Sequence, residues 1–167
     1  MDENLILKKD YSIVRIIPMN QNEEEPRING KPGERVKKDF FENQLLKREN
    51  NIYYYHGNML EFNNEPVFAM FQYGGKIIAC GWIMDRIKVS DNRYIEPIND
   101  TFPYDGMLIL ENVFALEDIN VFELNQTLKA PINSFSNVFY KLDVYEDKFK
   151  ELLLSKRMEY KTKHNEY

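Results

Sequence analysis

The aromatic residues in the middle of the chain are the side chains best suited to hold a planar ligand. Tyr53, Tyr54 and Tyr55 are consecutive, and because side chains alternate along a strand, at least one ring faces away from the core. Rings on neighbouring strands can sandwich a nucleobase, and each stack contributes about 1–3 kcal/mol. The same rings would also suit an ordinary aromatic core with surface tyrosines. We expect a partly exposed aromatic cleft lined by Tyr53, Tyr55, Phe71 and Trp82.

Three polar side chains of the same region have the chemistry needed to read the edge of a base. An amide such as that of Asn58 matches a base edge, and a carboxylate such as that of Asp85 accepts from an amino group. We expect His56, Asn58 and Asp85 at the rim of the cleft. Extruding a base costs a few kcal/mol, so single-stranded or modified nucleic acid is the expected partner.

Two basic stretches could follow a phosphate backbone. Residues 31–48 carry six bases and three acids, and residues 148–163 carry six bases and two acids. Helices side by side would then form a positive face on an acidic chain. The alternative is that each stretch is a solvated helix surface with i,i+4 ion pairs. The expected phosphate contacts are Arg35, Lys37, Lys38 and Arg48.

The segment from 91 to 123 has the opposite charge. It holds eight acids and a single base, Arg93. An alternative function is therefore a protein-interaction or inhibitor module that uses this acidic face, or an exposed strand edge, on a basic protein partner.

The sequence offers little for catalysis or metal binding. Cys80 is the only cysteine and lies in an apolar run, where thiols are usually inert. No zinc-ligand spacing and no phosphate-binding glycine motif is present. We therefore predict no catalytic residue, no metal site and no cofactor, and a non-enzymatic protein.

Composition points to one domain held together by packing. The chain has 167 residues and a net charge of −5, which suits one domain over 1–167 and excludes a long-range positive field. The single cysteine excludes an internal disulfide, and no apolar run approaches the roughly 20 residues of a membrane helix. These features favour a cytoplasmic protein.

The elements that must position these side chains follow from periodicity and turn residues. The patterns predict a strand over 11–19, a flexible insertion loop over 18–33 and an amphipathic helix over 34–49. Gly74-Gly75 predicts a two-residue hairpin turn, and Gly81 a bulge or a close backbone approach. Further predictions are a strand over 107–116, helices over 118–129 and 144–157, a closing strand or loop over 133–140, and a frayed tail over 158–167.

Several short strands without regular βα alternation predict an α+β fold, with a small, bent, mainly antiparallel sheet or pseudo-barrel flanked by helices. The hairpin PVFAMFQYGGKIIACGWIMDRIKV, the strand YDGMLILENVFALEDI and the segment INSFSNVFYKL before a terminal helix resemble the PUA-like superfamily, which includes EVE and ASCH domains. The resemblance implies a non-catalytic pseudo-barrel that recognises a modified or extruded base, with the positions around 53–58 and 82–85 lining the pocket.

A second resemblance suggests an enzyme. The unit AMFQYGGKIIACGWI is similar to the central hairpin of the GNAT acetyltransferases. In that family the next strand leads into a glycine-containing loop that holds the coenzyme A pyrophosphate. Here the chain continues DRIKVSDNRYIEPIND, which has no glycine, so this alternative lacks a recognisable cofactor loop.

Overall fold

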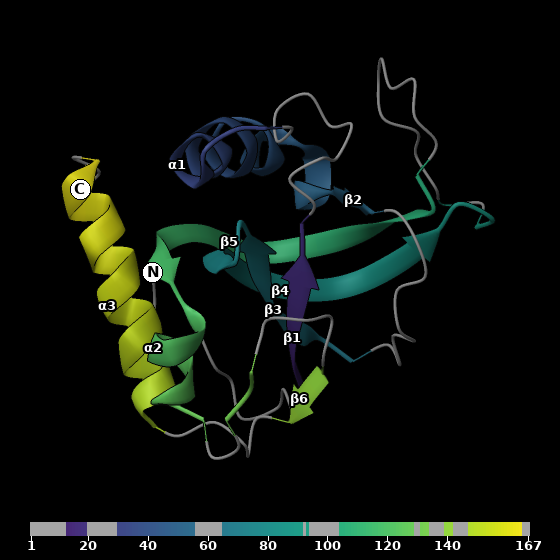
Figure 1. Cartoon of the computed structure of the whole chain (residues 1–167). Helices are drawn as coiled ribbons and strands as arrows, with labels where there is room; N and C mark the ends of the chain where they lie inside the picture. Colours follow the sequence, from purple (N-terminus) through teal and green to yellow (C-terminus); the bar gives the residue numbers. More distant parts are fainter. Residues whose placement is uncertain are drawn as a thin grey trace.

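The computed structural model describes residues 13–19, 30–55, 65–91, 93, 104–128, 131–133, 139–141 and 147–164. They form an α+β fold in which a curled sheet carries helical segments on both faces (Figure 1). The strands are β1 (Ile13–Pro18), β2 (Tyr53–Tyr55), β3 (Val67–Tyr73), β4 (Lys76–Lys88), β5 (Gly106–Ile119) and β6 (Phe139–Lys141).

The sheet is mixed but mainly antiparallel. Its strands are hydrogen-bonded in the order β2-β5-β4-β3-β1-β6. Strand β1 runs parallel to β3, and the other pairs of described strands are antiparallel. The predicted class, an α+β fold with a bent and mainly antiparallel sheet flanked by helices, is confirmed.

The hairpin predicted at Gly74-Gly75 joins β3 to β4. Both glycines have positive φ, 58° and 77°, which residues with a Cβ adopt only with strain. Tyr73 pairs with Lys76 across the turn. This turn fixes the register of β3 and β4.

Strand β4 bends at Gly81, as predicted. The pairing of β4 with β5 shifts register between Cys80 and Trp82. A Cβ on Gly81 would lie 2.9 Å from Cγ2 of Val113 on β5, so a larger residue would force Val113 or the β5 backbone to shift. The bulge helps long strands to coil, which gives the sheet its curled shape.

The predicted continuous helix over 34–49 is a series of short helical pieces. Its buried hydrophobic residues are Val36, the adjacent pair Phe40 and Phe41, and Leu45, so that the steps from Val36 to the pair and from the pair to Leu45 are four or five positions. The wider turn of a π-helix keeps such a spacing on one face better than an α-helix does. The pieces are α1 (Gly33–Arg35), the π-helix η2 (Val36–Glu42), and the 3₁₀ turns η3 (Leu45–Lys47) and η4 (Glu49–Asn51).

Two helices pack on the opposite face of the sheet. The short helix α2 (Val121–Asn125) occupies part of the predicted 118–129 helix and begins with a capping box in which Asn120 and Glu123 bond reciprocally. Helix α3 (Lys148–Lys163) extends well past the predicted end at 157. Among the described helices, none combines the length and apolarity needed to cross a bilayer.

The prediction of a frayed tail from 158 is wrong as far as His164, the last described residue of this segment. Tyr160 is fully buried, and His164 lies against its ring at a centroid distance of 4.4 Å. Tertiary contacts therefore hold the last turns of α3, although their sequence is highly charged.

The predicted insertion loop over 18–33 is anchored at both ends. Pro18 belongs to β1, and the N–H of Met19 donates to the carbonyl of Gln72 at 2.7 Å. At the other end, the hydroxyl of Tyr73 donates to the carbonyl of Lys31 at 2.6 Å. Residues 20–29 lie outside the described part of the chain.

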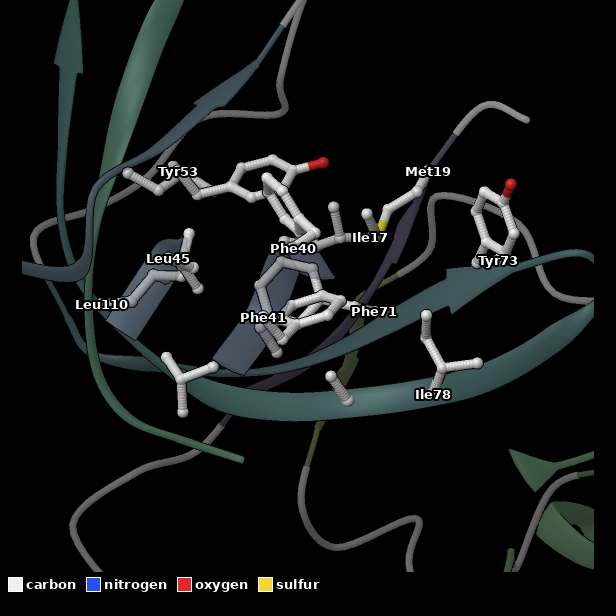
Figure 2. Packing of buried hydrophobic residues seen from close by; sticks show 14 of the residues in the cluster. Ile17, Met19, Phe40, Phe41, Leu45, Tyr53, Phe71, Tyr73, Ile78 and Leu110 are labelled. Carbon is white, nitrogen blue, oxygen red and sulfur yellow. The ribbon is translucent and has the colours of Figure 1, made fainter. Parts of the chain in front are cut away.

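The sheet separates two hydrophobic cores. We call the side that carries Tyr53, Phe71 and Ile78 the inner face, where the helical segment 33–51 packs (Figure 2). The outer face carries Phe68, Cys80 and Phe114, and α2 and α3 pack there through Leu124, Phe149 and Leu153.

Candidate functional site

The predicted aromatic cleft is not formed by these four rings. Tyr53, Tyr55, Phe71 and Trp82 expose 4%, 7%, 0% and 2% of their surface. The first three lie on the inner face, whereas Trp82 lies on the outer face, 4.9 Å from the ring of Phe68. The prediction that they line one open cleft is therefore wrong, because the sheet separates Trp82 from the others.

The helical segment 33–51 packs over the rings of Tyr53 and Phe71. The alternation of side chains along the strands could not predict this packing. The ring of Phe40 lies 6.0 Å from that of Tyr53, and Phe41 lies 5.2 Å from Phe71 (Figure 2). Tyr53 and Phe71 are themselves 5.3 Å apart. These mainly edge-on contacts are typical of a core, so the rings on this half of the inner face stabilise the fold.

Of the three predicted polar readers, only Asp85 belongs to the described residues. Its carboxylate pairs with the guanidinium of Arg93 at 2.7 Å and accepts from the backbone N–H of Arg86 at 2.8 Å. Asp85 is thus already engaged at the end of β4. His56 and Asn58 lie outside the described residues, and the prediction for them remains a prediction.

The prediction that Lys37 contacts phosphate is wrong. Its side chain is fully buried, and its Nζ lies 2.8 Å from Glu34 Oε1 and 2.7 Å from Asp118 Oδ1. The ring of Tyr160 is 5.5 Å away. Two of these partners come from β5 and α3, far away in the sequence, so helical charge spacing could not show that Lys37 points inward.

The other predicted phosphate contacts have different surroundings. Arg35 and Lys38 are exposed, and Arg35 lies 3.9 Å from the carboxylate of Asp39. Their contact with phosphate remains a prediction. The guanidinium of Arg48 donates to the carbonyl of Ile52 at 2.9 Å and lies 5.2 Å from the ring of Tyr54. Arg48 is therefore held against the aromatic end of β2.

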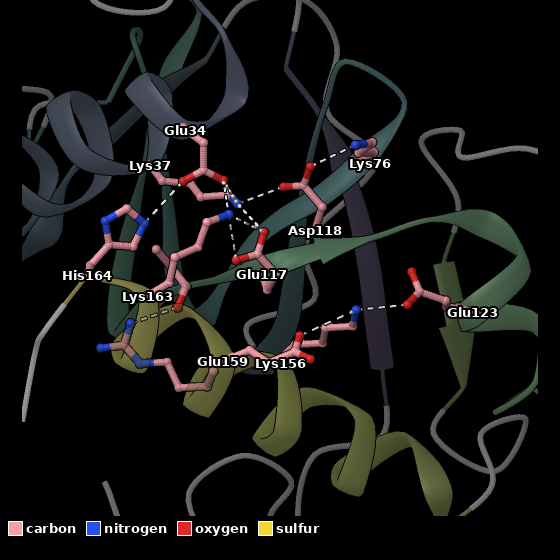
Figure 3. Close-up of polar contacts among 12 residues, drawn as sticks. Glu34, Lys37, Lys76, Glu117, Asp118, Glu123, Lys156, Glu159, Lys163 and His164 are labelled. Carbon is pink, nitrogen blue, oxygen red and sulfur yellow. Dashed lines mark hydrogen bonds and ion pairs between the residues drawn. The ribbon is translucent and has the colours of Figure 1, made fainter.

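An ion network surrounds Lys37 and joins α1, η2, β4, β5 and α3 (Figure 3). From the end of α3, Lys163 Nζ lies 3.3 Å from Glu117 on β5, and His164 Nε2 lies 3.2 Å from Glu34 on α1. We call this network the Lys37 cluster, and its members are Glu34, Lys37, Lys76, Glu117, Asp118, Lys163 and His164.

Electrostatics identify the Lys37 cluster as structural. Burial alone would raise the pKa of Glu34 and of Asp118, but hydrogen bonds and charges from neighbouring lysines outweigh it and hold each pKa below its ordinary value. Glu34, Glu117 and Asp118 place oxygens within 4.8 Å of one another, a spacing that could hold a metal ion. The ammonium of Lys37 already supplies a positive charge between Glu34 and Asp118, so the cluster ties α1 and α3 to the sheet.

The acidic segment 91–123 is partly neutralised by the same kind of contact. Glu117 and Asp118 belong to the Lys37 cluster, and Glu123 pairs with Lys156 of α3 at 2.8 Å. Asp105 and Glu111 are exposed. Internal pairing reduces the attraction that this segment could exert on a basic partner.

Cys80 has the properties expected of an inert thiol. It is fully buried on the outer face, and burial raises the pKa of its thiol well above the ordinary value. The thiolate needed for nucleophilic attack is therefore disfavoured.

A pair of arginines on the inner face was not singled out from the sequence. Arg15 on β1 lies directly opposite Ala69, and Arg86 on β4 lies directly opposite Leu108. Ala69 and Leu108 both belong to the inner core. Because side chains at paired positions project from the same face of a sheet, both guanidinium groups start from the inner face. We call Arg15 and Arg86 the arginine pair.

The two arginines lie within electrostatic reach of each other and of Tyr55. Arg15 is 3% exposed, and its burial, together with repulsion from Arg86, lowers its pKa to about 10. Burial also raises the pKa of Tyr55, although the positive charge of Arg86 opposes this shift. Both arginines have other interaction partners as well. At neutral pH the arginine pair places two positive charges beside a neutral phenol.

The arginine pair shares the inner face with the core that the helical segment covers, and Ile13 and Ile17, two residues before and after Arg15 on β1, pack with that core. Tyr55 is the last residue of β2, and its ring lies over Gly106, the first residue of β5. A Cβ on Gly106 would meet the hydroxyl of Tyr55. Arg86 is partly exposed, whereas Arg15 is buried. The signal in the sequence was a charged residue inside the apolar strand IVRIIP, at the same parity as Ile13 and Ile17.

Comparison with known proteins gave no match to a family model, to a curated protein or to a solved structure.

Proposed function

We propose that this protein is a non-enzymatic nucleic-acid-binding module with a PUA-like fold, and that the arginine pair holds its ligand. The observation that carries the proposal is the position of Arg15 and Arg86 on the inner face of the curled sheet, next to Tyr55. This position replaces the aromatic cleft as the expected binding site.

The chemistry of the arginine pair favours a ligand that carries a phosphate or a guanine base. Guanidinium groups bind phosphate oxygens and the edge of guanine through two parallel hydrogen bonds. Val67, Ile83 and Tyr55 are buried on the same face as the pair. Apolar walls with a few converging polar groups are the usual composition of a ligand site.

Binding should be tested with a single-stranded oligonucleotide of about 12 nucleotides, within the range of sites on small β-rich domains. The strand carries a 5′-phosphate and a 3′-fluorophore, and binding is followed by fluorescence anisotropy. Arg86→Gln should weaken binding about tenfold, because it removes a charge-assisted hydrogen bond to the ligand. It should also reduce the slope of affinity against salt by about 0.7, the value for one phosphate contact on a single strand.

The matched control is Lys148→Gln, which removes one positive charge from an exposed position at the start of α3, on the opposite face of the sheet. It should change the affinity less than about twofold, because exposed charges away from a site contribute little. Equal losses in the two variants would show that binding follows net charge alone. A wild-type protein that binds no oligonucleotide at low salt and micromolar concentrations would contradict the proposed function.

A further inference from the structure

The solvent side of the helical segment carries charge of one sign. Within 31–48 every charged residue that is exposed is a base, whereas the three acids are only partly exposed. Resting on the proposed function, we propose that Lys31, Arg35 and Lys38 form a surface that binds the phosphate backbone of single-stranded nucleic acid irrespective of its sequence. We call these three residues the basic face.

Packing fixes which side of the helical segment faces solvent. Phe40 and Phe41 are buried in the inner core, so the segment lies against the sheet through these rings and its opposite side is open (Figure 1). Lys38 is exposed, and the side chain of Arg35 is 67% exposed. The two cations can therefore be reached from solvent without any rearrangement of the fold.

The three cations of the basic face are neighbours. Nζ of Lys31 lies 3.3 Å from Oδ2 of Asp39, and Nη1 of Arg35 lies 3.9 Å from Oδ1 of the same carboxylate. Lys38 follows Arg35 by three positions, a spacing that makes residues neighbours on a helix surface. Among the described residues Lys38 has no ion-pair partner. Three cations around one carboxylate leave an excess of two positive charges.

The acid next to the basic face is already offset by the Lys37 cluster. Glu34 directly precedes Arg35, but its carboxylate lies 2.8 Å from Nζ of the buried Lys37 and 3.2 Å from Nε2 of His164. Lys163, at the end of α3, adds a positive charge 3.9 Å from the same carboxylate. Glu34 therefore does not cancel the excess positive charge of the basic face.

The burial of apolar side chains favours nucleic acid over a membrane as the partner. A basic helix that lies on a bilayer inserts an apolar face between the lipids. In the segment 33–51 the apolar residues pack in the inner core, and of its large hydrophobic residues only Leu46 is exposed. Contacts with a phosphate backbone need cations alone and carry no sequence information.

The main experiment measures how the affinity for single-stranded DNA depends on salt. Two strands of about 12 nucleotides, one of thymine alone and one of mixed sequence, carry a 3′-fluorophore and are titrated by fluorescence anisotropy. For both strands Lys38→Gln should reduce the slope of log affinity against log salt by about 0.7, the value for one phosphate contact. At about 0.1 M salt this corresponds to binding about fivefold weaker.

Lys148→Gln is the matched control, because it removes the same charge from an exposed position on the opposite face of the sheet. It should change the affinity less than about twofold. The combined variant Arg35→Gln and Lys38→Gln should lower the salt slope by about 1.4, as expected for two phosphate contacts. Far-ultraviolet circular dichroism verifies that each variant is folded. Equal slopes for Lys38→Gln and Lys148→Gln would overturn the assignment.

Asp39→Asn tests the basic face in the opposite direction. The substitution removes the negative charge that Lys31 and Arg35 share and keeps the size of the side chain. It should tighten binding of both strands about two- to threefold, because a nearby negative charge no longer repels the phosphates. Unchanged or weaker binding by the folded variant would contradict the assignment.

The outcomes separate this inference from the proposed function. If Arg86→Gln weakens binding while Lys38→Gln behaves like Lys148→Gln, the basic face holds no phosphate and this inference is overturned, whereas the proposed function stands. If Lys38→Gln lowers the salt slope and Arg86→Gln has no effect, the basic face stands and the assignment of the ligand to the arginine pair fails. If wild type binds neither strand at low salt, both proposals fail.

Lipid vesicles test the membrane as the other anionic partner. Vesicles of phosphatidylcholine and phosphatidylserine in equal parts carry negative charge without nucleic acid. At a salt concentration at which the strands bind, wild type should not sediment with these vesicles, because the apolar residues of the segment are buried. Sedimentation that is lost in Lys38→Gln, with no effect of Lys38→Gln on the strands, would assign the basic face to a membrane and overturn the proposal.

Discussion

Neighbouring residues of the same type acquire opposite functions from their surroundings. Lys37 and Lys38 are adjacent on η2, yet Lys37 is fully buried between carboxylates and Lys38 is exposed. Arg15 and Arg35 differ in the same way, since Arg15 is buried on the inner face of the sheet and Arg35 is exposed on α1. The chemistry of each cation is therefore set by what the fold places around it.

The first prediction at this scale concerns Lys37. Replacing it with methionine leaves Glu34 and Asp118 without their central cation, and breaking a buried ion pair in this way costs about 3–5 kcal/mol. The free energy of unfolding at pH 7, measured by urea denaturation, should fall by about that amount in Lys37→Met. Lys38→Met, the exposed neighbour, should stay within about 0.5 kcal/mol of wild type.

The same pair of variants should respond differently to pH. In the wild type the pKa values of Glu34 and Asp118 are lowered on folding. Their contribution is therefore present above the unfolded values of about 4.3 and 3.9, and it is lost as the pH falls through the lower folded values. Without Lys37 the pKa values of Glu34 and Asp118 in the folded protein rise, so protonating these carboxylates at low pH reduces the destabilisation of the variant. The difference in free energy of unfolding between Lys37→Met and wild type should therefore become smaller from pH 7 towards pH 4. A difference that stays constant would contradict this account.

At the scale of elements, glycine positions decide the curvature of the sheet. The hairpin at Gly74-Gly75 needs positive φ at both residues, whereas Gly81 is needed because Val113 approaches it closely. The first requirement can be inferred from the sequence alone. The second was inferred only as a bulge or a backbone approach, and the contact with Val113 depends on the pairing of β4 with β5.

Gly81→Ala should be destabilising for this reason. A Cβ would lie 2.9 Å from Val113 Cγ2 and 3.2 Å from Val113 Cα, and overpacking of this kind costs about 1–3 kcal/mol. Gly33→Ala is the matched control, because its Cβ would meet only Ile78 at 3.9 Å. Thermal denaturation should show a lower midpoint for Gly81→Ala and no loss for Gly33→Ala. Equal midpoints would show that β5 can shift away from β4 at little cost.

At the scale of the whole molecule, α3 connects the outer face to the helical segment of the inner face. Phe149 and Leu153 pack in the outer core, whereas Lys163 and His164 reach the carboxylates of Glu117 and Glu34. The last turns of α3 are thus part of the fold, and they contact a segment more than a hundred residues earlier in the chain.

This connection can be tested at Tyr160. Tyr160→Ala removes a fully buried ring that lies against Lys37 and His164, and such truncations cost about 3–5 kcal/mol. Met158→Ala, two residues earlier and 61% exposed, should change the free energy of unfolding by less than about 0.5 kcal/mol. If urea denaturation gave similar values for both variants, the end of α3 would contribute little to stability.

The sequence by itself determined the local features of this protein. Alternation of β-branched and aromatic residues indicated the strands, the two glycines indicated the hairpin, and the absence of regular βα alternation indicated an α+β fold. These features follow from backbone dihedrals and side-chain periodicity, which act over a few residues. Only the tertiary structure decided that the helical segment covers Tyr53 and Phe71, that Lys37 points inward, and that Arg15 and Arg86 share a face. Each depends on which distant segments pack together, because burial and charge pairing are properties of the assembled fold.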